Sequence, residues 1–370
     1  MKILHISHEK LPDWRVEKSA ITGSKFGYSI YFAGVDSSNY RSDVFNKIIS
    51  INWTSKARFG IPYYYHLLKK QVKNILDEIR PDIIHAHNIF AARISSEFDY
   101  PIVYDDHEYW SDLVQLLFKK KRFTSIKKME DLKIYLRNKF IIPQWIKWEK
   151  EIVSNHPTIT VSYQIINELR KHGSMKSMYF VPNYPNINEI NDLITPYFHD
   201  SFSSLYSGSD GCYIEKQPHR NMDGFIELFN FNKLGNLTIL GWTENSTKRV
   251  CFKGRLERAK MYNEMTNHSV GILPWKQHPS HRYVNPNKVY EYAHAGLMVI
   301  CTSDFLEIRN NLNGHLNTFN SYNELTDILK DLSTNPEELY KRRIAIFKYA
   351  REKLLWENYE RNIINAYSKS

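Results

Sequence analysis

The chain has 370 residues, of which 42% are hydrophobic and 14% aromatic, and its formal net charge is +10. This length fits two domains better than one, and this composition excludes a disordered chain. No apolar run approaches the ~18–20 residues that span a bilayer, and the apolar run after Met1 is too short for a signal peptide core.

Strand and helix signals alternate along the first half of the chain. Helical patterns lie at His66–Ile79 and Ile165–Lys171. The apolar runs that predict strands are Ile3–Ser7, Ser29–Ala33, Val44–Ile49, Asp82–His87, Ile102–Tyr104, Thr158–Ser162 and Tyr179–Val181. Strands that alternate with helices are typical of a parallel, doubly wound sheet, which we expect for residues 1–182.

A basic stretch interrupts this alternation between residues 119 and 139. It holds nine Lys or Arg and only two acids, with apolar residues threaded through it at helix-like spacing. A basic amphipathic segment can lie on an anionic membrane surface, although an ordinary solvated helix face fits the pattern equally well. The cations of the predicted membrane patch are Lys119, Lys120, Lys121, Arg122, Lys127 and Lys128.

A turn-rich segment, VPNYP at Val181–Pro185, separates the two halves of the chain. The predicted boundary therefore follows residue 182, with a second domain over residues 183–350. The strands predicted there are Ser203–Ser207, Leu237–Gly241, Arg249–Phe252, Val270–Leu273 and Leu297–Thr302. A long amphipathic helix is expected from about Pro336 to Ser368. The α/β pattern predicts two Rossmann-like domains facing across a cleft, with ligands at the carboxyl ends of the strands.

Residues 285–302 are typical of a capped helix followed by a buried strand. Asn285 is the expected N-cap, Pro286 suits a first helical position, and Gly296 suits the left-handed residue that ends a helix. Free N–H groups at such a helix start favour an anion such as a diphosphate. Glu291, one to two turns further on, has the chemistry to bind a vicinal diol. A purely structural helix explains these residues equally well.

A second polar group follows the strand predicted at residues 102–104. Residues 105–108 read Asp-Asp-His-Glu, and His85 and His87 lie on the neighbouring predicted strand. These side chains can act as acids, bases or metal ligands. The sequence does not fix whether His85 and His87 face His107, so a metal site is not favoured on this ground.

Motifs for several other classes of protein are missing. The chain has no G-x-x-x-x-G-K-[ST] loop, no G-x-S-x-G elbow and no Cys-x-x-Cys pair. Its three cysteines, Cys212, Cys251 and Cys301, are far apart, which favours a reducing compartment and no zinc–cysteine site. No nucleic-acid-binding motif accompanies the basic charge, so nucleic acid is not an expected partner.

The 285–302 run resembles the donor-site segment of retaining glycosyltransferases with the GT-B fold, the glycosyl transferases group 1 family. The matching residues are Pro286, Lys288, Glu291, Tyr292, Ala295, Gly296, Val299 and Ile300. The family's usual proline is Met298 here, and a usual glutamate is Tyr283. Weaker matches lie, in the family's order, at residues 13–16, 80–88, 103–108, 181–185 and 356–359. The resemblance therefore covers nearly the whole chain.

This resemblance implies a donor site in the second domain. Glu291 would hold the ribose, and the backbone N–H groups of Asn287 and Lys288 would hold the diphosphate. Arg220 matches the family's lysine, while the family's arginine falls near Ser209 and has no cationic match. Lys216 is the expected replacement, although it also fits a plain solvated loop. Tyr283, in place of the glutamate, puts the identity of the donor sugar in doubt.

The resemblance also implies roles in the first domain. His107 would contact the sugar at the reaction centre, so His107 and Glu291 are the expected catalytic residues. Asp13 and Arg15 lie where the family often has a glycine pair, and they are the expected acceptor-side residues. For Arg15, a surface ion pair is an equal alternative. The last helix, over residues 351–370, is expected to return to the first domain.

The function expected from this resemblance is transfer of a sugar from a nucleotide-diphosphate sugar to a hydroxyl of a lipid-linked or growing glycan, with retention. No cofactor and no metal are expected. The expected location is the cytoplasm, at the inner face of the membrane. Two alternatives stay open: a nucleotide-sugar 2-epimerase of the same fold, and a non-catalytic glycan- or membrane-binding protein on a degenerate scaffold.

Overall fold

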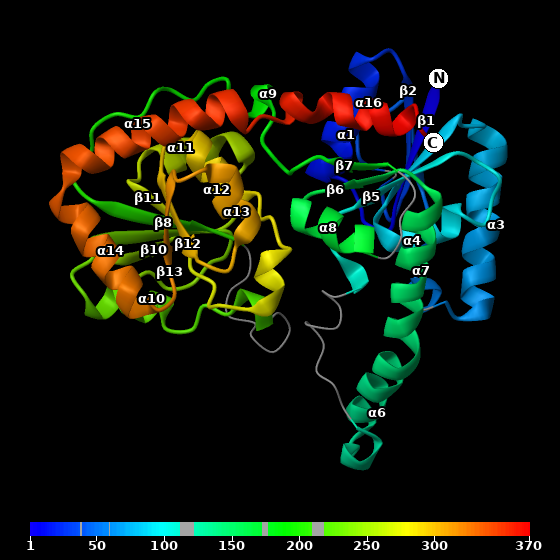
Figure 1. Ribbon diagram of the computed structural model, residues 1–370, viewed down its shortest axis with the longest axis horizontal. Helices are drawn as coiled ribbons and strands as arrows, with labels where there is room; N and C mark the ends of the chain where they lie inside the picture. The colour runs from blue at the N-terminus through cyan, green and yellow to red at the C-terminus, as the bar shows by residue number, and fades with distance from the viewer. Residues whose placement is uncertain (38, 59, 112–121, 172–176, 209–217) are drawn as a thin grey trace. The chain divides into compact units, whose positions relative to one another are not determined.

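The computed structural model describes residues 1–37, 39–58, 60–111, 122–171, 177–208 and 218–370 (Figure 1). The chain forms two compact units, each with its own sheet and core. Unit 1 comprises Met1–Pro182 together with Tyr359–Ser370, and unit 2 comprises Asn183–Asn358.

In the described residues, unit 1 contains a seven-stranded sheet in the order β3-β2-β1-β4-β5-β6-β7. Every neighbouring pair of strands is parallel. The strands are β1 (Lys2–Ser7), β2 (Ser29–Gly34), β3 (Lys47–Ser50), β4 (Ile83–His87), β5 (Ile102–Asp106), β6 (Thr158–Thr160) and β7 (Met178–Phe180). The order reverses between β1 and β4, as in doubly wound nucleotide-binding folds. The predicted parallel sheet is thereby confirmed.

Helices connect these strands and cover the sheet. They are α1 (Trp14–Lys25), α2 (Ser55–Arg58), α3 (Pro62–Ile79), α4 (Asn88–Ser95), α6 (Met129–Leu136), α7 (Ile142–Asn155), α8 (Tyr163–Lys171) and α16 (Glu360–Tyr367). The last of these, α16, belongs to unit 1 and is tied to it by hydrogen bonds. The Asn362 side chain donates to the carbonyl of Phe180 at 2.9 Å, and Lys25 pairs with Glu360 at 2.7 Å.

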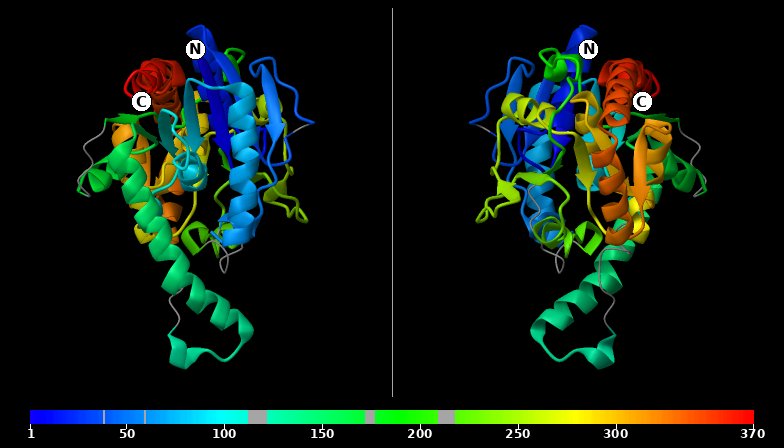
Figure 2. Two further views of the ribbon diagram at one scale, coloured as in Figure 1. Left: turned by 90° about the vertical axis from the view of Figure 1, so that its right-hand side faces the viewer. Right: turned by 90° about the vertical axis from the view of Figure 1, so that its left-hand side faces the viewer.

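Residues 122–141 form an arm that extends from the start of α7 (Figures 1 and 2). The arm contains a 3₁₀ turn at Phe123–Ser125, helix α6 and a π-helical stretch at Arg137–Ile141, and none of these has a buried residue. Four of its apolar side chains are exposed: Phe123 at 68%, Met129 at 69%, Leu136 at 42% and Phe140 at 58%. The predicted patch residues Arg122, Lys127 and Lys128 lie on it and are exposed. Lys119, Lys120 and Lys121 lie outside the described residues.

Unit 2 repeats the topology of unit 1. Its described residues form a six-stranded parallel sheet in the order β10-β9-β8-β11-β12-β13. The strands are β8 (Ser203–Ser207), β9 (Asn236–Leu240), β10 (Val250–Phe252), β11 (Val270–Leu273), β12 (Met298–Thr302) and β13 (Leu316–Phe319). The first five were predicted. The last was missed, because LNTF carries little apolar signal and is only partly buried.

The helices of unit 2 are α9 (Ile187–Ile190), α10 (Phe225–Phe231), α11 (Arg258–Thr266), α12 (Lys288–His294), α13 (Leu306–Leu312), α14 (Tyr322–Thr334) and α15 (Pro336–Lys353). The single terminal helix predicted from Pro336 to Ser368 is wrong. Helix α15 ends at Lys353, a 3₁₀ turn follows at Trp356–Tyr359, and α16 starts at Glu360. Trp356 is 1% exposed in this turn, and its N–H donates to the carbonyl of Pro185 at 3.0 Å. Burial of the Trp356 indole thus stabilises the turn that separates α15 from α16.

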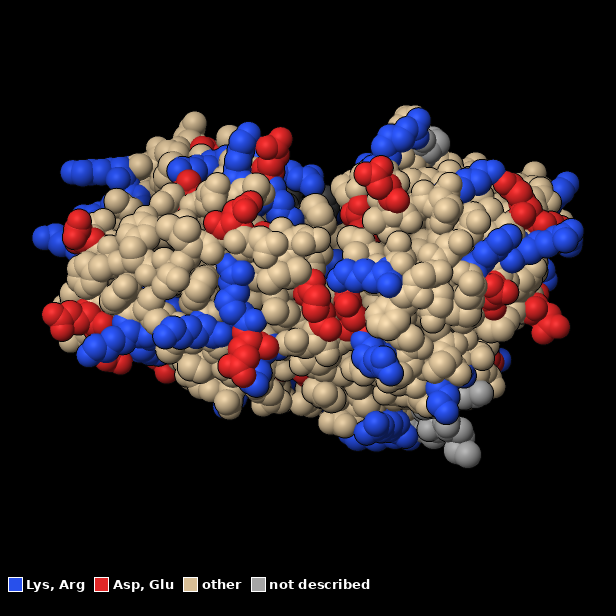
Figure 3. All heavy atoms as spheres, turned by 90° about the horizontal axis from the view of Figure 1, so that it is seen from above, with Lys and Arg blue, Asp and Glu red and all other residues tan. Residues whose placement is uncertain are grey.

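The surface charge is mixed on the face shown in Figure 3, where Lys and Arg alternate with Asp and Glu. Among the described residues, no helix combines the length and the hydrophobicity that crossing a bilayer requires. Both described cysteines are free; Cys301 is buried in β12, as predicted, and Cys251 is exposed. Cys212 lies outside the described residues.

Candidate functional site

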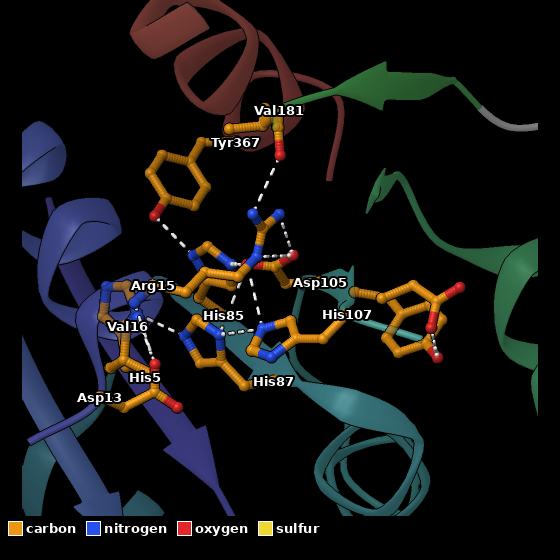
Figure 4. A network of polar contacts seen from close by, with 12 residues as sticks. His5, Asp13, Arg15, Val16, His85, His87, Asp105, His107, Val181 and Tyr367 are labelled. Carbon is orange, nitrogen blue, oxygen red and sulfur yellow. Dashed lines mark hydrogen bonds and ion pairs between the residues drawn. The ribbon is translucent and has the colours of Figure 1, made fainter. Parts of the chain in front are cut away.

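Four buried polar residues lie side by side on β1, β4 and β5 of unit 1. The register pairs His5 with His85 and His87 with Asp105. Because side chains two residues apart on a strand share a face, His85 and His87 both point toward the same side as Asp105. Their rings stack with centroids 4.4 Å apart, and all four side chains are essentially inaccessible to solvent. Figure 4 shows the cluster from close by.

Asp105 is the charged centre of this cluster. Arg15, on α1, donates to Asp105 Oδ1 from Nη2 at 2.6 Å and from Nε at 2.9 Å, and from Nη1 to the carbonyl of Val181 at 2.9 Å. Burial by itself would raise the pKa of Asp105, but the charges of Arg15 and His107 outweigh it and hold the pKa well below its usual range. Asp105 is therefore an ionised carboxylate inside the unit.

Three histidines form a chain of short contacts that ends at His107, the residue after β5. His5 Nδ1 lies 2.9 Å from His87 Nε2, and His87 Nδ1 lies 3.2 Å from His107 Nε2. Burial, followed by the neighbouring imidazoles, holds the pKa values of His5 and His87 well below the usual value. The side chain of His107 is 16% exposed. The sequence placed His107 at the carboxyl end of its strand, which is where it lies.

The two residues expected on the acceptor side have structural contacts. Asp13 is the N-cap of α1 and accepts from the backbone N–H groups of Arg15 at 2.9 Å and Val16 at 3.2 Å. Arg15 is 5% exposed, so the expectation of a surface ion pair is wrong, and its burial leaves it little surface for an acceptor. Arg15 instead fixes Asp105. His85 is a packing residue too, with its Nδ1 2.8 Å from the hydroxyl of Tyr367.

In unit 2, two of the predicted cations lie against the same indole. Trp275 follows β11, and its ring centroid is 5.2 Å from Arg220 Cζ and 4.9 Å from Lys288 Nζ. The same Lys288 Nζ lies 4.9 Å from the ring of Tyr206 on β8. Tyr206 lies on β8 and Trp275 follows β11, and these are the two strands at which the strand order of unit 2 reverses. Ligands of doubly wound folds bind beside this reversal point.

Gly208 makes room for Lys288. A Cβ at residue 208 would lie 2.7 Å from Lys288 Nζ and 2.5 Å from the hydroxyl oxygen of Tyr206, so a side chain there would displace both. Sequence reasoning missed Gly208 and Trp275. The signal that would have indicated them is their position directly after two predicted strands, where a doubly wound fold gathers its ligand contacts. Lys216, the other predicted cation, lies outside the described residues.

The helix start predicted at residues 285–286 is wrong by two residues. Helix α12 begins at Lys288, and Asn287 is its N-cap residue without a side-chain capping bond. Asn285 accepts a hydrogen bond from the hydroxyl of Tyr290 and is buried, so it fixes the loop. The predicted end is confirmed: Gly296 has φ +70° and a Cβ there would lie 2.0 Å from Pro196 Cγ. Only glycine fits this position.

Glu291, the predicted ribose ligand, forms an ion pair within unit 2. Its Oε1 lies 2.9 Å from Arg258 Nη1, and Arg258 also pairs with Glu189 on α9. Burial alone would lower the pKa of Arg258, but Glu291 and then Tyr262 and Glu189 raise it above its usual value. Sequence reasoning missed Arg258 and Glu189, because Glu189, Arg258 and Glu291 lie on three helices that are far apart in the chain.

Tyr283 takes the place where the family usually has a glutamate. It is 3% exposed, its ring lies 4.5 Å from the guanidinium carbon of Arg282, and its hydroxyl accepts from that side chain. A tyrosine hydroxyl is uncharged near pH 7, so the position offers a sugar no carboxylate.

The sequence matches no protein-family model, and comparison with curated proteins finds no match. Comparison with solved structures finds the same fold along the entire chain. Sucrose-phosphate synthase from Thermosynechococcus elongatus has a TM-score of 0.74 at 13% identity, covering 100% of this chain and 98% of that one. Anabaena HepE, in complex with UDP-glucose, has a TM-score of 0.67 at 13% identity and full coverage of both chains.

WaaG, described as a glycosyltransferase involved in lipopolysaccharide biosynthesis, has a TM-score of 0.64 at 15% identity, covering 98% of this chain and 99% of that one. Because all three identities are low, these likenesses establish the fold alone. The chain is an α/β protein with the two Rossmann-like domains of the GT-B fold, as the sequence predicted.

Proposed function

We propose that this chain is a glycosyltransferase that moves a sugar from a nucleotide-diphosphate sugar to a hydroxyl group. The observation that carries the proposal is the meeting of Arg220 and Lys288 on Trp275 at the reversal point of unit 2. Arg220 Cζ and Lys288 Nζ lie 5.2 and 4.9 Å from the centroid of that ring, and cations of this kind bind phosphate oxygens through charge-assisted hydrogen bonds. HepE, which shares the fold, was solved with UDP-glucose. A diphosphate is an anion that two such cations can bind.

The cations have a chemical purpose in such a reaction. Negative charge grows on the diphosphate as the glycosidic bond breaks, and fixed positive charge stabilises it at that moment. Arg220 and Lys288 are the proposed source of this charge, with Lys216 and the backbone N–H groups of Asn287 and Lys288 as further donors. Transfer then needs no metal ion.

The remaining roles follow from the resemblance of the 285–302 run. Glu291 is the proposed ribose ligand, held in place by Arg258, and His107 is the proposed contact to the sugar at the reaction centre. We propose transfer with retention, in which the departing phosphate helps to take the proton from the acceptor hydroxyl. Tyr283 is the proposed reason for a donor sugar that differs from those the family's glutamate selects.

The test is a screen of nucleotide sugars and free nucleoside diphosphates by thermal stabilisation. A ligand at ~100 times its dissociation constant adds about 2.7 kcal/mol to the free energy of unfolding. Lys288→Gln should reduce the affinity for the diphosphate about tenfold or more, because one charge-assisted contact is worth about 1.5–3 kcal/mol. The control is Lys260→Gln, an exposed lysine of unit 2 that pairs with the exposed Glu257.

The outcomes also separate the alternatives. Release of sugar to a glycan or lipid-linked acceptor supports transfer. Conversion of one nucleotide sugar into its 2-epimer without any acceptor would identify an epimerase. Binding without either reaction would identify a non-catalytic protein. Stabilisation by no nucleotide, or equal affinity in Lys288→Gln, would refute the donor site itself.

We further propose that the enzyme works in the cytoplasm at the inner face of the membrane, docked by the arm at residues 122–141, on a lipid-linked or growing glycan. The arm carries six Lys or Arg against two acids, together with exposed aromatic side chains. Cations near an anionic leaflet contribute about 1 kcal/mol each, and apolar side chains add to this by entering the interface.

Anionic and neutral vesicles test the arm. Lys127→Glu with Lys128→Glu should weaken binding to vesicles that contain phosphatidylserine and leave nucleotide affinity unchanged. The matched control is Lys147→Glu with Lys150→Glu, two exposed lysines on α7 that change the net charge by the same amount. Binding should fall with added salt, because exposed charges are screened. Equal binding by both double variants would locate the interaction elsewhere.

A further inference from the structure

We propose that His87, Asp105 and His107 in unit 1 form a binding site for one divalent transition-metal ion of the zinc class. Their ligand atoms approach one another closely. His87 Nδ1 lies 3.2 Å from His107 Nε2 and 3.4 Å from Asp105 Oδ2, and His107 Nε2 lies 3.6 Å from the same oxygen. The three atoms therefore form a nearly equilateral triangle (Figure 4).

This triangle has the dimensions of one face of a tetrahedral metal site. Zinc binds imidazole nitrogen and carboxylate oxygen at about 2.0–2.2 Å, so neighbouring ligands in a tetrahedron lie about 3.3–3.6 Å apart. The three measured separations fall close to this value. The three atoms are therefore spaced as ligands of one ion are. Two imidazoles with one carboxylate is also a ligand set that zinc and its neighbours in the first transition row accept.

The contacts around Asp105 determine which of its oxygens an ion would meet. Arg15 Nη2 and Nε donate to Asp105 Oδ1 at 2.6 and 2.9 Å, and Nε also lies 3.1 Å from Oδ2. Oδ2 is the oxygen that faces the histidines, because His87 Nδ1 and His107 Nε2 lie 3.4 and 3.6 Å from it.

Residues behind the triangle orient the ligands. When His87 Nδ1 binds an ion, its Nε2 must carry the proton, and this N–H has His5 Nδ1 as an acceptor at 2.9 Å. Ligating histidines usually have such a partner for the second ring nitrogen. His85 Nε2 lies 3.3 Å from Asp105 Oδ2 and supports the carboxylate. His107 is the only partly exposed member of the three, so it marks the side from which an ion and a fourth ligand can enter.

This site lies beyond the proposed transfer reaction, in which no metal takes part. An ion held here would engage His107 and withdraw it from a sugar. We therefore expect binding of the ion and use of His107 by a donor to exclude each other.

The test uses the 370-residue chain without a tag, freed of metal with a chelator and titrated with Co²⁺. We expect one equivalent to bind, with the visible absorption bands of tetrahedral cobalt, and one equivalent of Zn²⁺ to abolish them. His107→Gln should weaken Co²⁺ binding at least tenfold; this partly exposed position should tolerate the change, and circular dichroism checks the fold. His66→Gln, at an exposed histidine of α3, is the control and should bind normally.

Two results would overturn the proposal. The first is the absence of saturable Co²⁺ binding by the folded wild-type protein. The second is unchanged binding by folded His107→Gln, which would shift any ion to His5, His85 and His87, whose ligand atoms also lie within 4.8 Å of one another. The assay needs no nucleotide or acceptor, so its result is independent of the proposed transfer activity.

Discussion

At the reversal point of its sheet, between β1 and β4, unit 1 holds imidazoles that are almost fully buried, with a carboxylate on the adjacent strand β5. At the matching point of unit 2, between β8 and β11, Arg220 and Lys288 lie against Trp275 and stay partly exposed. The two sheets share the same strand order around the reversal point. The difference between the two units at this point therefore lies in their side chains. The polar groups of unit 1 contact one another inside the unit, whereas we propose that the two cations of unit 2 contact a ligand.

This difference predicts different responses to mutation. Changes at the reversal point of unit 1 should act mainly on stability, because its charges are paired inside the unit. Changes at the proposed donor site of unit 2 should act mainly on ligand affinity. The predictions below test this contrast, from the largest expected effect to the smallest.

The largest effect is expected for Arg15→Met. The substitution keeps much of the side-chain volume but leaves the buried carboxylate of Asp105 without its cation. Loss of one partner of a buried ion pair typically costs about 3–5 kcal/mol. We expect the free energy of unfolding of unit 1 to fall by this amount in urea denaturation, with nucleotide affinity unchanged in the protein that remains folded.

The matched control for Arg15→Met is Arg170→Met, at an exposed position on α8 of the same unit. It should change the free energy of unfolding by less than about 0.5 kcal/mol, as surface substitutions usually do. A loss below about 1 kcal/mol for Arg15→Met would show that the pair contributes little, and the contrast between the units would then fail.

The next effect is expected for Glu291→Gln in unit 2, and it should appear in binding. A carboxylate accepts two charge-assisted hydrogen bonds from a ribose diol, whereas an amide accepts more weakly and brings a mismatched donor. We expect nucleotide-sugar affinity to fall roughly tenfold to a hundredfold in calorimetry, or about 1.4–2.7 kcal/mol. Arg258 keeps its pairing with Glu189, so the fold should persist.

Glu227→Gln, at an exposed position on α10, is the control for this change and should bind normally. If folded Glu291→Gln binds and transfers as the wild type does, the ribose assignment is wrong. The match at residues 285–302 would then report the fold alone.

A third prediction concerns pH and a histidine of unit 2 that lies outside the donor site. Burial lowers the pKa of His294 to about 4, and its Nε2–H donates to the carbonyl of Leu354 at 2.8 Å. In the unfolded chain this histidine binds a proton near pH 6.5, so the unfolded state binds more protons between pH 6.5 and 4. Stability is therefore lost as pH falls through this window.

At pH 5 this single group should cost about 2 kcal/mol relative to pH 7, since one pKa unit corresponds to about 1.36 kcal/mol. His294→Gln keeps an N–H donor but cannot titrate. Its urea denaturation should depend less steeply on pH than that of the wild type. The control is His66→Gln, at an exposed position. Parallel pH profiles for His294→Gln and the wild type would contradict the prediction.

The sequence predicted those features of the fold that a local residue pattern determines. Buried parallel strands appear in the sequence as short apolar runs. Gly296 was recognisable as the end of a helix because glycine readily adopts the left-handed conformation found after a helix, and its φ here is +70°. The cap at Asn285 was predicted wrongly, since its side chain bonds Tyr290 rather than a free N–H group. The preference of asparagine for caps did not reveal this competing partner.

Contacts between distant segments were not predictable. Whether His87 faces His107 depends on the register of β4 against β5, which pairs His87 with Asp105. The ion pair between Arg258 and Glu291 depends on how two helices pack within unit 2. Neither contact can be derived from a spacing along the chain. The sequence therefore identified His107 and Glu291 as site residues but did not identify the side chains that contact them.

The smallest effect on nucleotide affinity is expected for Tyr283→Glu, which restores the family's usual residue. The new carboxylate has a cation at hand, because the guanidinium carbon of Arg282 already lies 4.5 Å from the tyrosine ring. The diphosphate contacts proposed for Arg220 and Lys288 involve other side chains. Affinity for the free nucleoside diphosphate should therefore change less than about twofold, or about 0.4 kcal/mol.

The preference among nucleotide sugars should change instead, because a carboxylate accepts hydrogen bonds from sugar hydroxyls more strongly than a neutral phenol does. Tyr283→Phe separates the two contributions, since it keeps the ring and removes only the hydroxyl. Competition binding across a panel of nucleotide sugars gives the measurement. An unaltered preference in Tyr283→Glu, with normal diphosphate binding, would place Tyr283 outside the sugar pocket and leave donor choice to other residues of the two units.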